Sequence, residues 1–566
     1  MQAALSSPTL SPDLSREARV SLRGADADGR VRQLVAARGL LRPRLAALAL
    51  VLVRKRRYEP LGFRCLGDYG RERLGVGARA LREWARVWEA LSELPQLRGA
   101  LLGGEVSFSV AGRVVAVATP ETDQACVETV CGRTVRAVET LLRAVSGDVE
   151  PAEAAGEEAR VRVDVPLEPL ALPRWAAACE LARRMAGEAL PVWECAELIS
   201  AETLAAIGSV GSVQPGEQPR APKRSAGPTA ADAGQGESGL RHEAFPALRF
   251  GGLSRLRPEL LLERERELEA LEAWAADACA HDLDAALCEA MRRLQQLDGD
   301  LGLLLGEILE RRLHRELGFA RFDRYVEERV DVAARTVRRW MQLARLDGEP
   351  GGAVATALRT GEITEMQASL VAQASTPTSA PEWVALARQV TLRRLETEVA
   401  ACTAGACAGP AARVSFFAPP EVASVFHAAL TAVRTHLAGA TGRPAPPARA
   451  LAWMLEHAIA AWLEQGASFK DYADFNRDHF RCTAPGCTAR RSLQSHHIVR
   501  RSAGGADEPW NRTTLCAFHH QRGIHAGLVH CRGRAPDALV FALGVRTGGP
   551  PLLRARSGDV LEPASP

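Results

Sequence analysis

The chain has 566 residues, of which 47% are hydrophobic, so it is long enough to form several domains that each bury a core. Its most apolar stretch, LAALALVLV before Arg54, is about half as long as a membrane-spanning helix, which excludes a membrane span there. The 13 cysteines are scattered along the chain, and no charged start with an apolar core opens it. We therefore expect a multidomain globular protein of the reducing cytoplasm, without a membrane partner.

A duplication organises the N-terminal two thirds of the chain. The segment LGFRCLGDYGRERLGVGARALREW, which ends at Trp84, matches LGFARFDRYVEERVDVAARTVRRW, which ends at Trp340, at one constant offset. Such self-similarity indicates one helical unit that is present twice. We predict a partly disordered segment at 1–39, copy 1 of the helical repeat at 40–204 and copy 2 at 246–410.

Two helices joined by a short turn are expected within each matched segment. The second helix, which begins near Ala78 in copy 1 and near Ala334 in copy 2, carries arginines and a tryptophan. This pattern fits a helix-turn-helix that contacts DNA, and it also fits an ordinary helical hairpin with a buried tryptophan. Self-association or contact with a partner protein is a further use that the sequence leaves open for these helices.

The remaining boundaries follow from composition. Residues 205–245 are rich in Gly, Pro, Ser and Ala, which predicts a flexible linker between the copies. A short apolar segment and two helical patterns separated by a proline-rich loop predict a helical connector at 411–470. The last module is expected at 471–545, with a hairpin formed by GLVHCRG and ALVFALG at its end, followed by a tail at 546–566.

Two short cysteine and histidine spacings in the last module predict a structural zinc site. Cys482 and Cys487 form a C-x4-C pair, and Cys516 and His519 form a C-x2-H pair further along the chain. Three thiolates and one imidazole can close a tetrahedral zinc site. Three unpaired thiols in a reducing compartment are the alternative, but short paired spacings favour zinc.

A second group of candidate ligands remains in the same module: His496, His497, Asn511, His520 and His525. Together with the cysteine pairs, the stretches LQSHHIVRRSAGG, WNRTTLC and CAFHHQRGIH resemble the HNH endonuclease family, the ββα-metal or His-Me finger nucleases, in its zinc-knuckle form. The resemblance covers only the C-terminal module. It implies an α+β module of the ββα-metal fold, after a mainly α-helical duplicated region, that hydrolyses DNA phosphodiester bonds with one divalent metal ion.

The resemblance also assigns roles to individual residues. His497, on a strand, would be the general base that activates the attacking water, and His496 and His520 would bind the catalytic metal. Asn511 would hold the imidazole of His497 in its productive tautomer through a side-chain or backbone contact.

The spacing of the last histidines bears on how two metals could share one helix. Neighbouring residues lie about 100° apart around a helix, so His519 can face the zinc site while His520 faces the cleavage site. His525 follows five positions after His520, with Gly523 between them, so we expect the helix to end near Gly523 and His525 to return through a turn as a third ligand. An all-imidazole set leaves Mg, Mn, Ni and Zn open as the catalytic metal.

Positive charge is concentrated in this module. From Arg481 to Arg534 the chain has nine arginines and two acidic residues, so nine minus two gives a net charge of +7 before any metal, whereas the whole chain is only +3. Such a local basic footprint favours DNA as the partner. The arginines expected to contact DNA phosphates are Arg490, Arg491, Arg500, Arg501, Arg512 and Arg522.

Two other functions remain compatible with the sequence. One is a noncatalytic DNA-binding or regulatory protein whose zinc module is only structural, although such a protein has no use for His497, Asn511 and His520 together. The other is an RNA-directed HNH nuclease, because the expected active site contacts only the phosphate and the sugar.

Overall fold

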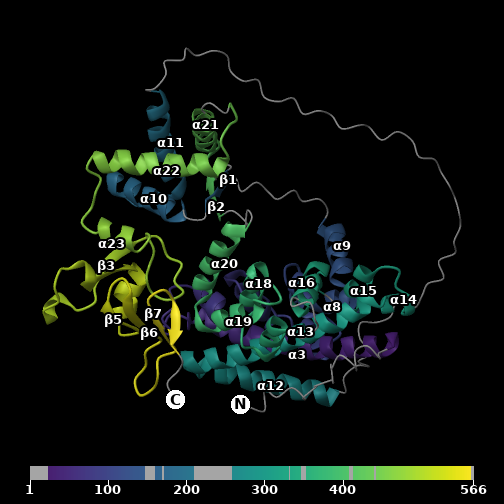
Figure 1. The fold of residues 1–566 in the computed structure, drawn as a ribbon. Coiled ribbons are helices and arrows are strands. Elements are labelled where there is room, and N and C mark those ends of the chain that lie inside the picture. Colours follow the sequence, from purple (N-terminus) through teal and green to yellow (C-terminus); the bar gives the residue numbers. More distant parts are fainter. Residues whose placement is uncertain are drawn as a thin grey trace.

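The computed structural model describes residues 23–146, 160–168, 171–208, 258–330, 332–345, 352–406, 412–438 and 442–562. These residues are mostly helical, with small antiparallel sheets concentrated toward the C-terminus (Figure 1), which confirms the expected predominance of helix. Of the segment 1–39 that is expected to be partly disordered, residues 1–22 lie outside the described residues, whereas residues 24–39 belong to the long helix α3 (Gly24–Arg54). Of the flexible linker expected at 205–245, residues 205–208 end a helix and the rest lie outside the described residues. No helix in the described ranges is both long and apolar enough to cross a membrane.

The two copies of the repeat have matching series of helices. In copy 1 these are α3 (Gly24–Arg54), α4 (Leu66–Tyr69), the π-helix η1 (Gly70–Leu74), α5 (Ala78–Ala90), α6 (Pro95–Gly103), α7 (Phe108–Val114), α8 (Asp123–Val130) and α9 (Val135–Ser146). After α12 (Pro258–Asp277), copy 2 has α13 (Ala280–Glu310), α14 (Leu313–Glu316), α15 (Phe322–Arg329), α16 (Ala334–Ala344), α17 (Ala353–Thr360), α18 (Glu365–Ala374), α19 (Ala380–Gln389) and α20 (Leu392–Ala406).

Local geometry repeats between the copies as well. Phe63 packs edge-on against Tyr69 with ring centroids 5.5 Å apart, and Phe319 packs in the same way against Tyr325 at 5.3 Å. Helix α6 is followed by Gly104 in the left-handed conformation, and the matching helix α17 is followed in the same way by Gly361. The duplication in the sequence is therefore a duplication of structure.

The two copies pack through their long helices, α3 and α13, and exchange ion pairs to buried carboxylates. Arg73 of copy 1 pairs with Asp284 of α13 at 2.6 Å, and Arg329 of copy 2 pairs with Asp28 of α3 at 3.3 Å. Arg329 lies 256 positions after Arg73 (329 − 73), and Asp284 lies 256 positions after Asp28 (284 − 28). Equivalent residues of the two copies therefore form both ion pairs, and each copy contributes one arginine and one aspartate. A buried charge needs its partner, so each copy completes the other, and together they form one unit.

A second unit joins segments from distant parts of the chain. Strand β1 (Val161–Leu167) pairs antiparallel with β2 (Ala412–Ala418). Helices α10 (Leu172–Ala186), α11 (Val192–Gly208), α21 (Pro420–His436) and α22 (Pro447–Glu464) pack with this sheet and lie above the repeats in Figure 1. The stacked rings of Trp175 and Phe416, 5.9 Å apart, lie in its core. The C-terminal part of the predicted copy 1 thus shares a core with the predicted connector.

The C-terminal module contains two small sheets. After α23 (Tyr472–Arg477), β3 (Leu493–His497) pairs antiparallel with β4 (Arg512–Cys516), with the short 3-10 turns η4 (Arg501–Ala503) and η5 (Pro509–Asn511) between them. The π-helix η6 (Phe518–Ile524) follows directly, so the order is strand, strand, helix. A four-stranded antiparallel sheet then forms from β5 (Val529–Arg534), β6 (Ala538–Leu543), β7 (Leu553–Arg556) and β8 (Val560–Glu562).

This four-stranded sheet extends the expected terminal hairpin. Strands β7 and β8 lie in the segment 546–566 that composition assigns to a tail. Buried Phe541 of β6 lies opposite buried Ala555 of β7, and burial of such apolar side chains holds the two added strands on the hairpin.

Candidate metal centres and catalytic site

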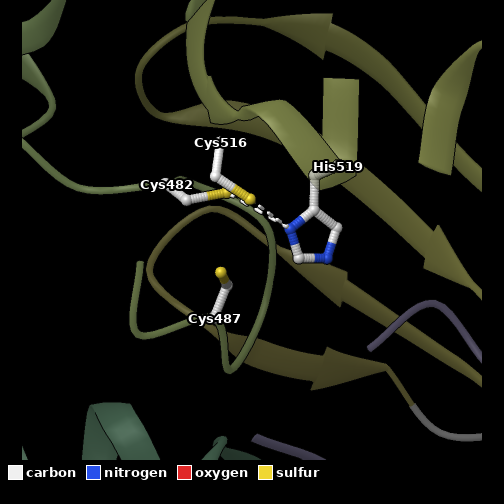
Figure 2. A group of neighbouring side chains, drawn as sticks. All are labelled: Cys482, Cys487, Cys516 and His519. Atoms are coloured by element: carbon white, nitrogen blue, oxygen red, sulfur yellow. Dashed lines mark hydrogen bonds between the residues drawn. The ribbon is translucent and has the colours of Figure 1, made fainter. Parts of the chain in front are cut away.

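The four side chains of the predicted zinc site converge at one point. Cys482 and Cys487 come from the turn before β3, Cys516 ends β4, and His519 lies on η6, and Figure 2 shows all four directed toward one centre. The Nδ1 atom of His519 lies 3.5 Å from the Sγ atom of Cys482 and 3.3 Å from that of Cys516. The four ligand atoms all lie within 4.8 Å of one another, and all four residues are buried.

These dimensions fit a zinc ion. Zinc–sulfur bonds of about 2.3 Å and zinc–nitrogen bonds of about 2.0–2.1 Å at a tetrahedral angle place sulfur and nitrogen about 3.5–3.6 Å apart, close to the measured separations. Burial raises the pKa of Cys487, but hydrogen bonds with Cys482 and Cys516 and the nearby His519 outweigh burial and hold it well below its usual range. The pKa values of Cys482 and Cys516 are raised, chiefly by burial at Cys482 and by hydrogen bonds with the other two thiols at Cys516. Without metal the cluster thus favours one thiolate, at Cys487, which is the form that binds metal, and its geometry could hold zinc.

The zinc cluster is anchored to copy 1 of the repeat. The second ring nitrogen of His519, Nε2, donates a hydrogen bond to the carbonyl oxygen of Gly62 at 2.9 Å. In the neutral ring this contact places the proton on Nε2, and Nδ1 faces the sulfur atoms, as a metal ligand requires. Thr488, next to the cluster, donates to the carboxylate of Asp68 in copy 1 at 2.7 Å.

Copy 2 contacts the same cluster through one arginine. Arg393 of α20 is 7% exposed and donates from Nη1 to the backbone carbonyl oxygens of Cys482, at 3.0 Å, and Cys487. Its other nitrogens donate to the buried carboxylate of Asp559 between β7 and β8, at 2.7 and 2.6 Å. Glu72 of copy 1 in turn accepts the backbone N–H of Leu392 at 2.8 Å at the start of α20. The zinc cluster is thus the point where both copies meet the C-terminal module.

A second cluster consists of the three predicted catalytic-metal ligands. One nitrogen from each of His496, His520 and His525 lies within 4.8 Å of the other two. The ring centroids of His496 and His520 are 5.0 Å apart, and those of His520 and His525 are 4.9 Å apart. His519 and His520 therefore belong to different clusters although they are neighbours on η6.

The conformation of η6 explains the five-residue spacing, and the helix ends one residue after Gly523, as expected. The segment is a π-helix that continues to Ile524, and the backbone N–H of His525 donates to the carbonyl of His520 at 3.2 Å. A π-helix forms bonds between residues five apart, which brings those residues onto one face. His525 thus lies in the turn that follows the helix, as expected, and the wider helix brings it to His520.

The electrostatic environment favours uncharged imidazoles in this cluster. Burial, with contributions from His520 and His525, lowers the pKa of His496 to about 4, and burial also lowers the pKa of His520. The amide oxygen of Gln494 accepts a hydrogen bond from Nδ1 of His520 at 2.7 Å, which leaves Nε2 of His520 free as a ligand. Neutral imidazoles are the form that binds metal.

His497 lies at the end of β3, next to this cluster in the chain, and its ring is held by an acidic residue. The Nε2 atom of His497 donates to Oδ1 of Asp507 at 2.9 Å. The hydrogen bond from His497 is the main cause that lowers the pKa of Asp507, and Arg501 and Arg512 contribute. A carboxylate acceptor at Nε2 fixes the tautomer that leaves Nδ1 without a proton.

Asn511 stabilises the loop after His497 and does so through the backbone. Its side-chain oxygen accepts the N–H of Val499 at 2.8 Å, and its side-chain nitrogen donates to the carbonyls of Val499 and Ala506 at 3.0 and 2.8 Å. The contact with the His497 imidazole that is expected from the side chain or backbone of Asn511 is made by the side chain of Asp507 in its place. Asn511 is fully buried and shapes the loop that carries Asp507.

The six predicted phosphate-binding arginines lie in different environments. Arg490 donates to the backbone carbonyl of His479 at 2.7 Å, and Arg512, 14% exposed, pairs with Asp474 at 3.0 Å and Asp507 at 3.2 Å. These two arginines therefore hold the module together. The exposed side chains are those of Arg491, Arg500, Arg501 and Arg522.

Two of the exposed arginines are also paired. Arg501 contacts Asp507 at 3.2 Å, and Arg522 contacts Glu59 of copy 1 at 3.2 Å. The pair of Arg501 and Asp507 is exposed on both sides and therefore weak, so Arg501 can exchange its partner for a phosphate. Glu59 is buried, so Arg522 is held more firmly.

Three functional residues escape sequence reasoning. Gln494 offers a signal, because it precedes His496 by two positions on a strand and so shares its face. Asp507 is one of only two acidic residues in the basic stretch, but its role depends on how the loop folds back. Arg393 lies far from the module in sequence, and its contact with the zinc cluster follows from tertiary packing alone.

Comparison with protein-family models, with curated proteins and with solved structures gave no match to this chain.

Proposed function

We propose that this chain is a metal-dependent endonuclease of the HNH type that hydrolyses DNA phosphodiester bonds with His497 as general base. The observation that carries the proposal is the meeting of two kinds of histidine at the end of β3. His496 joins His520 and His525 in a three-imidazole cluster, and the next residue, His497, has a carboxylate partner at Nε2. A module with a structural zinc site alone requires neither feature.

The three-histidine cluster suits a divalent ion at a reaction site better than a structural ion. Closed structural zinc sites use four protein ligands, as the cysteine cluster does, whereas reaction sites keep a position for water or substrate. A divalent ion there would act as a Lewis acid on the scissile phosphate and neutralise charge on the leaving 3′ oxygen. Gln494 orients one of these ligands, in the way that outer contacts commonly orient metal-bound histidines.

His497 supplies the acid–base chemistry in this proposal. With Nε2 donating to Asp507, Nδ1 accepts the proton of the attacking water, and the imidazolium that forms is stabilised by the Asp507 carboxylate. The His497 side chain is 22% exposed, so its ring can reach a substrate in solvent. Asp507 acts through His497 and is a positioning residue.

The decisive measurement is the nicking of supercoiled plasmid by the purified full-length chain across Mg²⁺, Mn²⁺, Ni²⁺ and Zn²⁺. We expect nicking with at least one of these ions and a loss of about 10²–10⁴-fold in the His497→Ala variant, because general-base catalysis contributes that much. His427→Ala, which removes an exposed histidine from α21, is the matched control and should retain full activity. Equal rates in the His497→Ala and wild-type proteins would overturn the proposal.

A further inference from the structure

The outer face of the four-stranded sheet β5–β8 carries a concentration of positive charge. Side chains alternate across a strand, and here one face is buried while the other is in solvent. The buried face includes Leu539, Phe541 and Ala555. The exposed basic side chains of the outer face are His530, Arg532, Arg534, Arg554 and Arg556.

The strand register arranges these basic residues in two rows. Arg532 of β5 lies opposite Val540 of β6, which lies opposite Arg556 of β7. His530 and Arg554 flank Ala542 of β6 in the same way. Because adjacent strands are about 4.8 Å apart, the rows on β5 and β7 are separated by about 10 Å, with small apolar side chains between them.

Most of this charge is not neutralised by the protein. Arg556 pairs with Glu562 at 2.8 Å, whereas no ion pair is found for Arg532, Arg534 or Arg554 within the described part of the chain. Surface charges that serve solubility alone are usually interspersed in sign. A face on which one sign predominates favours a polyanion such as a nucleic-acid backbone.

The basic face is continuous with the candidate catalytic site. The guanidinium of Arg534 lies over the ring of Trp510 at 4.2 Å, and the N–H of Ala535 donates to the carbonyl of Trp510 at 2.8 Å. Trp510 directly precedes Asn511, which holds the loop after His497. At its other end, β5 follows η6, the helix that carries the metal ligands.

We propose that the outer face of β5–β8 is the surface on which duplex DNA lies, with the arginine rows of β5 and β7 binding its phosphates. The identification of DNA as the polyanion rests on the proposed function. Of the six arginines that the sequence singles out for this role, two hold the module together, Arg501 and Arg522 are paired, and Arg491 and Arg500 are exposed, so the sheet would add its contacts to those of the exposed arginines. Such contacts are independent of base sequence.

The test measures binding separately from cleavage. Full-length His497→Ala protein is titrated against a fluorescent 30-base-pair duplex from 0.05 to 0.3 M salt, with and without the additional pair Arg532→Gln/Arg554→Gln. The matched control carries Arg266→Gln/Arg315→Gln, which removes two exposed arginines from α12 and α14. Two lost phosphate contacts should lower the slope of log affinity against log salt by about 1.8 and weaken binding about 60-fold at 0.1 M salt.

Each outcome is informative. A lower slope in the sheet variant together with an unchanged slope in the control supports the proposal. If the sheet variant and the control variant have the same slope of log affinity against log salt, the proposal is overturned. It is also overturned if the parent protein shows no measurable DNA binding. Plasmid nicking by the wild-type chain is measured separately. If the wild-type chain nicks plasmid but the sheet arginines do not affect binding, the DNA-binding surface is rejected and the proposed activity is kept. If the sheet arginines support binding but the wild-type chain does not nick plasmid, the surface is kept and the proposed activity is rejected.

Discussion

Arg393 is expected to be a major support of the zinc cluster although it lies in the helical repeat. In the Arg393→Met variant the side chain keeps its stem and loses the guanidinium that bonds Asp559 and the carbonyls of Cys482 and Cys487. Arg393 and Asp559 are only 7% and 5% exposed, so the carboxylate would remain buried without its partner. Breaking a buried pair in this way costs about 3–5 kcal/mol.

The assay is the release of zinc to a chromophoric chelator during an equilibrium urea titration of the full-length chain. With a urea dependence of about 1–3 kcal/mol per M, the loss should move the midpoint of zinc release down by about 1 M or more. The second variant, Arg393→Met/Asp559→Asn, removes the uncompensated charge and should recover part of the shift. Asparagine suits this position because residue 559 has a φ of 64°.

The neighbouring Arg394 is the matched control. It pairs with Glu398 one turn along the same helix, and its side chain is 42% exposed, so Arg394→Met should cost less than about 0.5 kcal/mol. Equal midpoints for Arg393→Met and Arg394→Met would refute the idea that Arg393 supports the cluster. A midpoint of the Asp559→Asn double variant below that of Arg393→Met would refute the assignment of the cost to the unpaired carboxylate.

Three further predictions concern the two clusters. Cys482→Ser or Cys516→Ser should release zinc and unfold the C-terminal module, because binding energy at such a site is folding energy; elemental analysis that finds no tightly bound zinc in the wild type would contradict this. The folded-state pKa of His496, about 4, lies below its ordinary value of 6.5. In protein whose histidine cluster is free of metal, the unfolded state therefore binds the extra proton first, and the free energy of unfolding should fall as pH drops from about 6.5 to 4. His496→Gln should flatten that fall in the denaturant midpoint, and an unchanged pH dependence would reject it. Asp507→Asn should slow nicking about 10–100-fold and change the tautomer of the His497 ring seen by nitrogen NMR, whereas a merely structural role would leave that tautomer unchanged.

The contacts around the zinc cluster also decide how the helical region can be studied. A chain that begins near residue 411 would lose Gly62, Glu72 and Arg393, and β2 would lose its partner β1. A comparison of such a fragment with the full-length chain would therefore mix instability with any loss of DNA recognition. Point substitutions on the exposed arginines of α5 and α16, such as Arg82→Gln and Arg335→Gln, test DNA contact by the repeats without removing these supports.

Short-range patterns in the sequence were sufficient for several features of this protein. The constant offset between the two matched segments predicts duplicated helices, and the structure has them. The C-x4-C and C-x2-H spacings select the four residues that converge around one centre, because ligands that close one small site lie on short turns and adjacent strands. The assignment of His519 to the cysteine cluster and of His520 to the histidine cluster follows from the different directions of neighbouring side chains on a helix.

Tertiary structure decided the rest, because the remaining contacts join residues with no relation in sequence. The partner of His497 is Asp507 only because Asn511 ties the intervening loop to the end of the hairpin. The reach of His525 depends on the π-helical form of η6, which a spacing of five residues does not by itself reveal. The use of Arg393 and Gly62 at the zinc cluster depends on the exchange of buried charges that packs the two copies into one unit, since burial of a charge requires a partner that only the folded chain brings near.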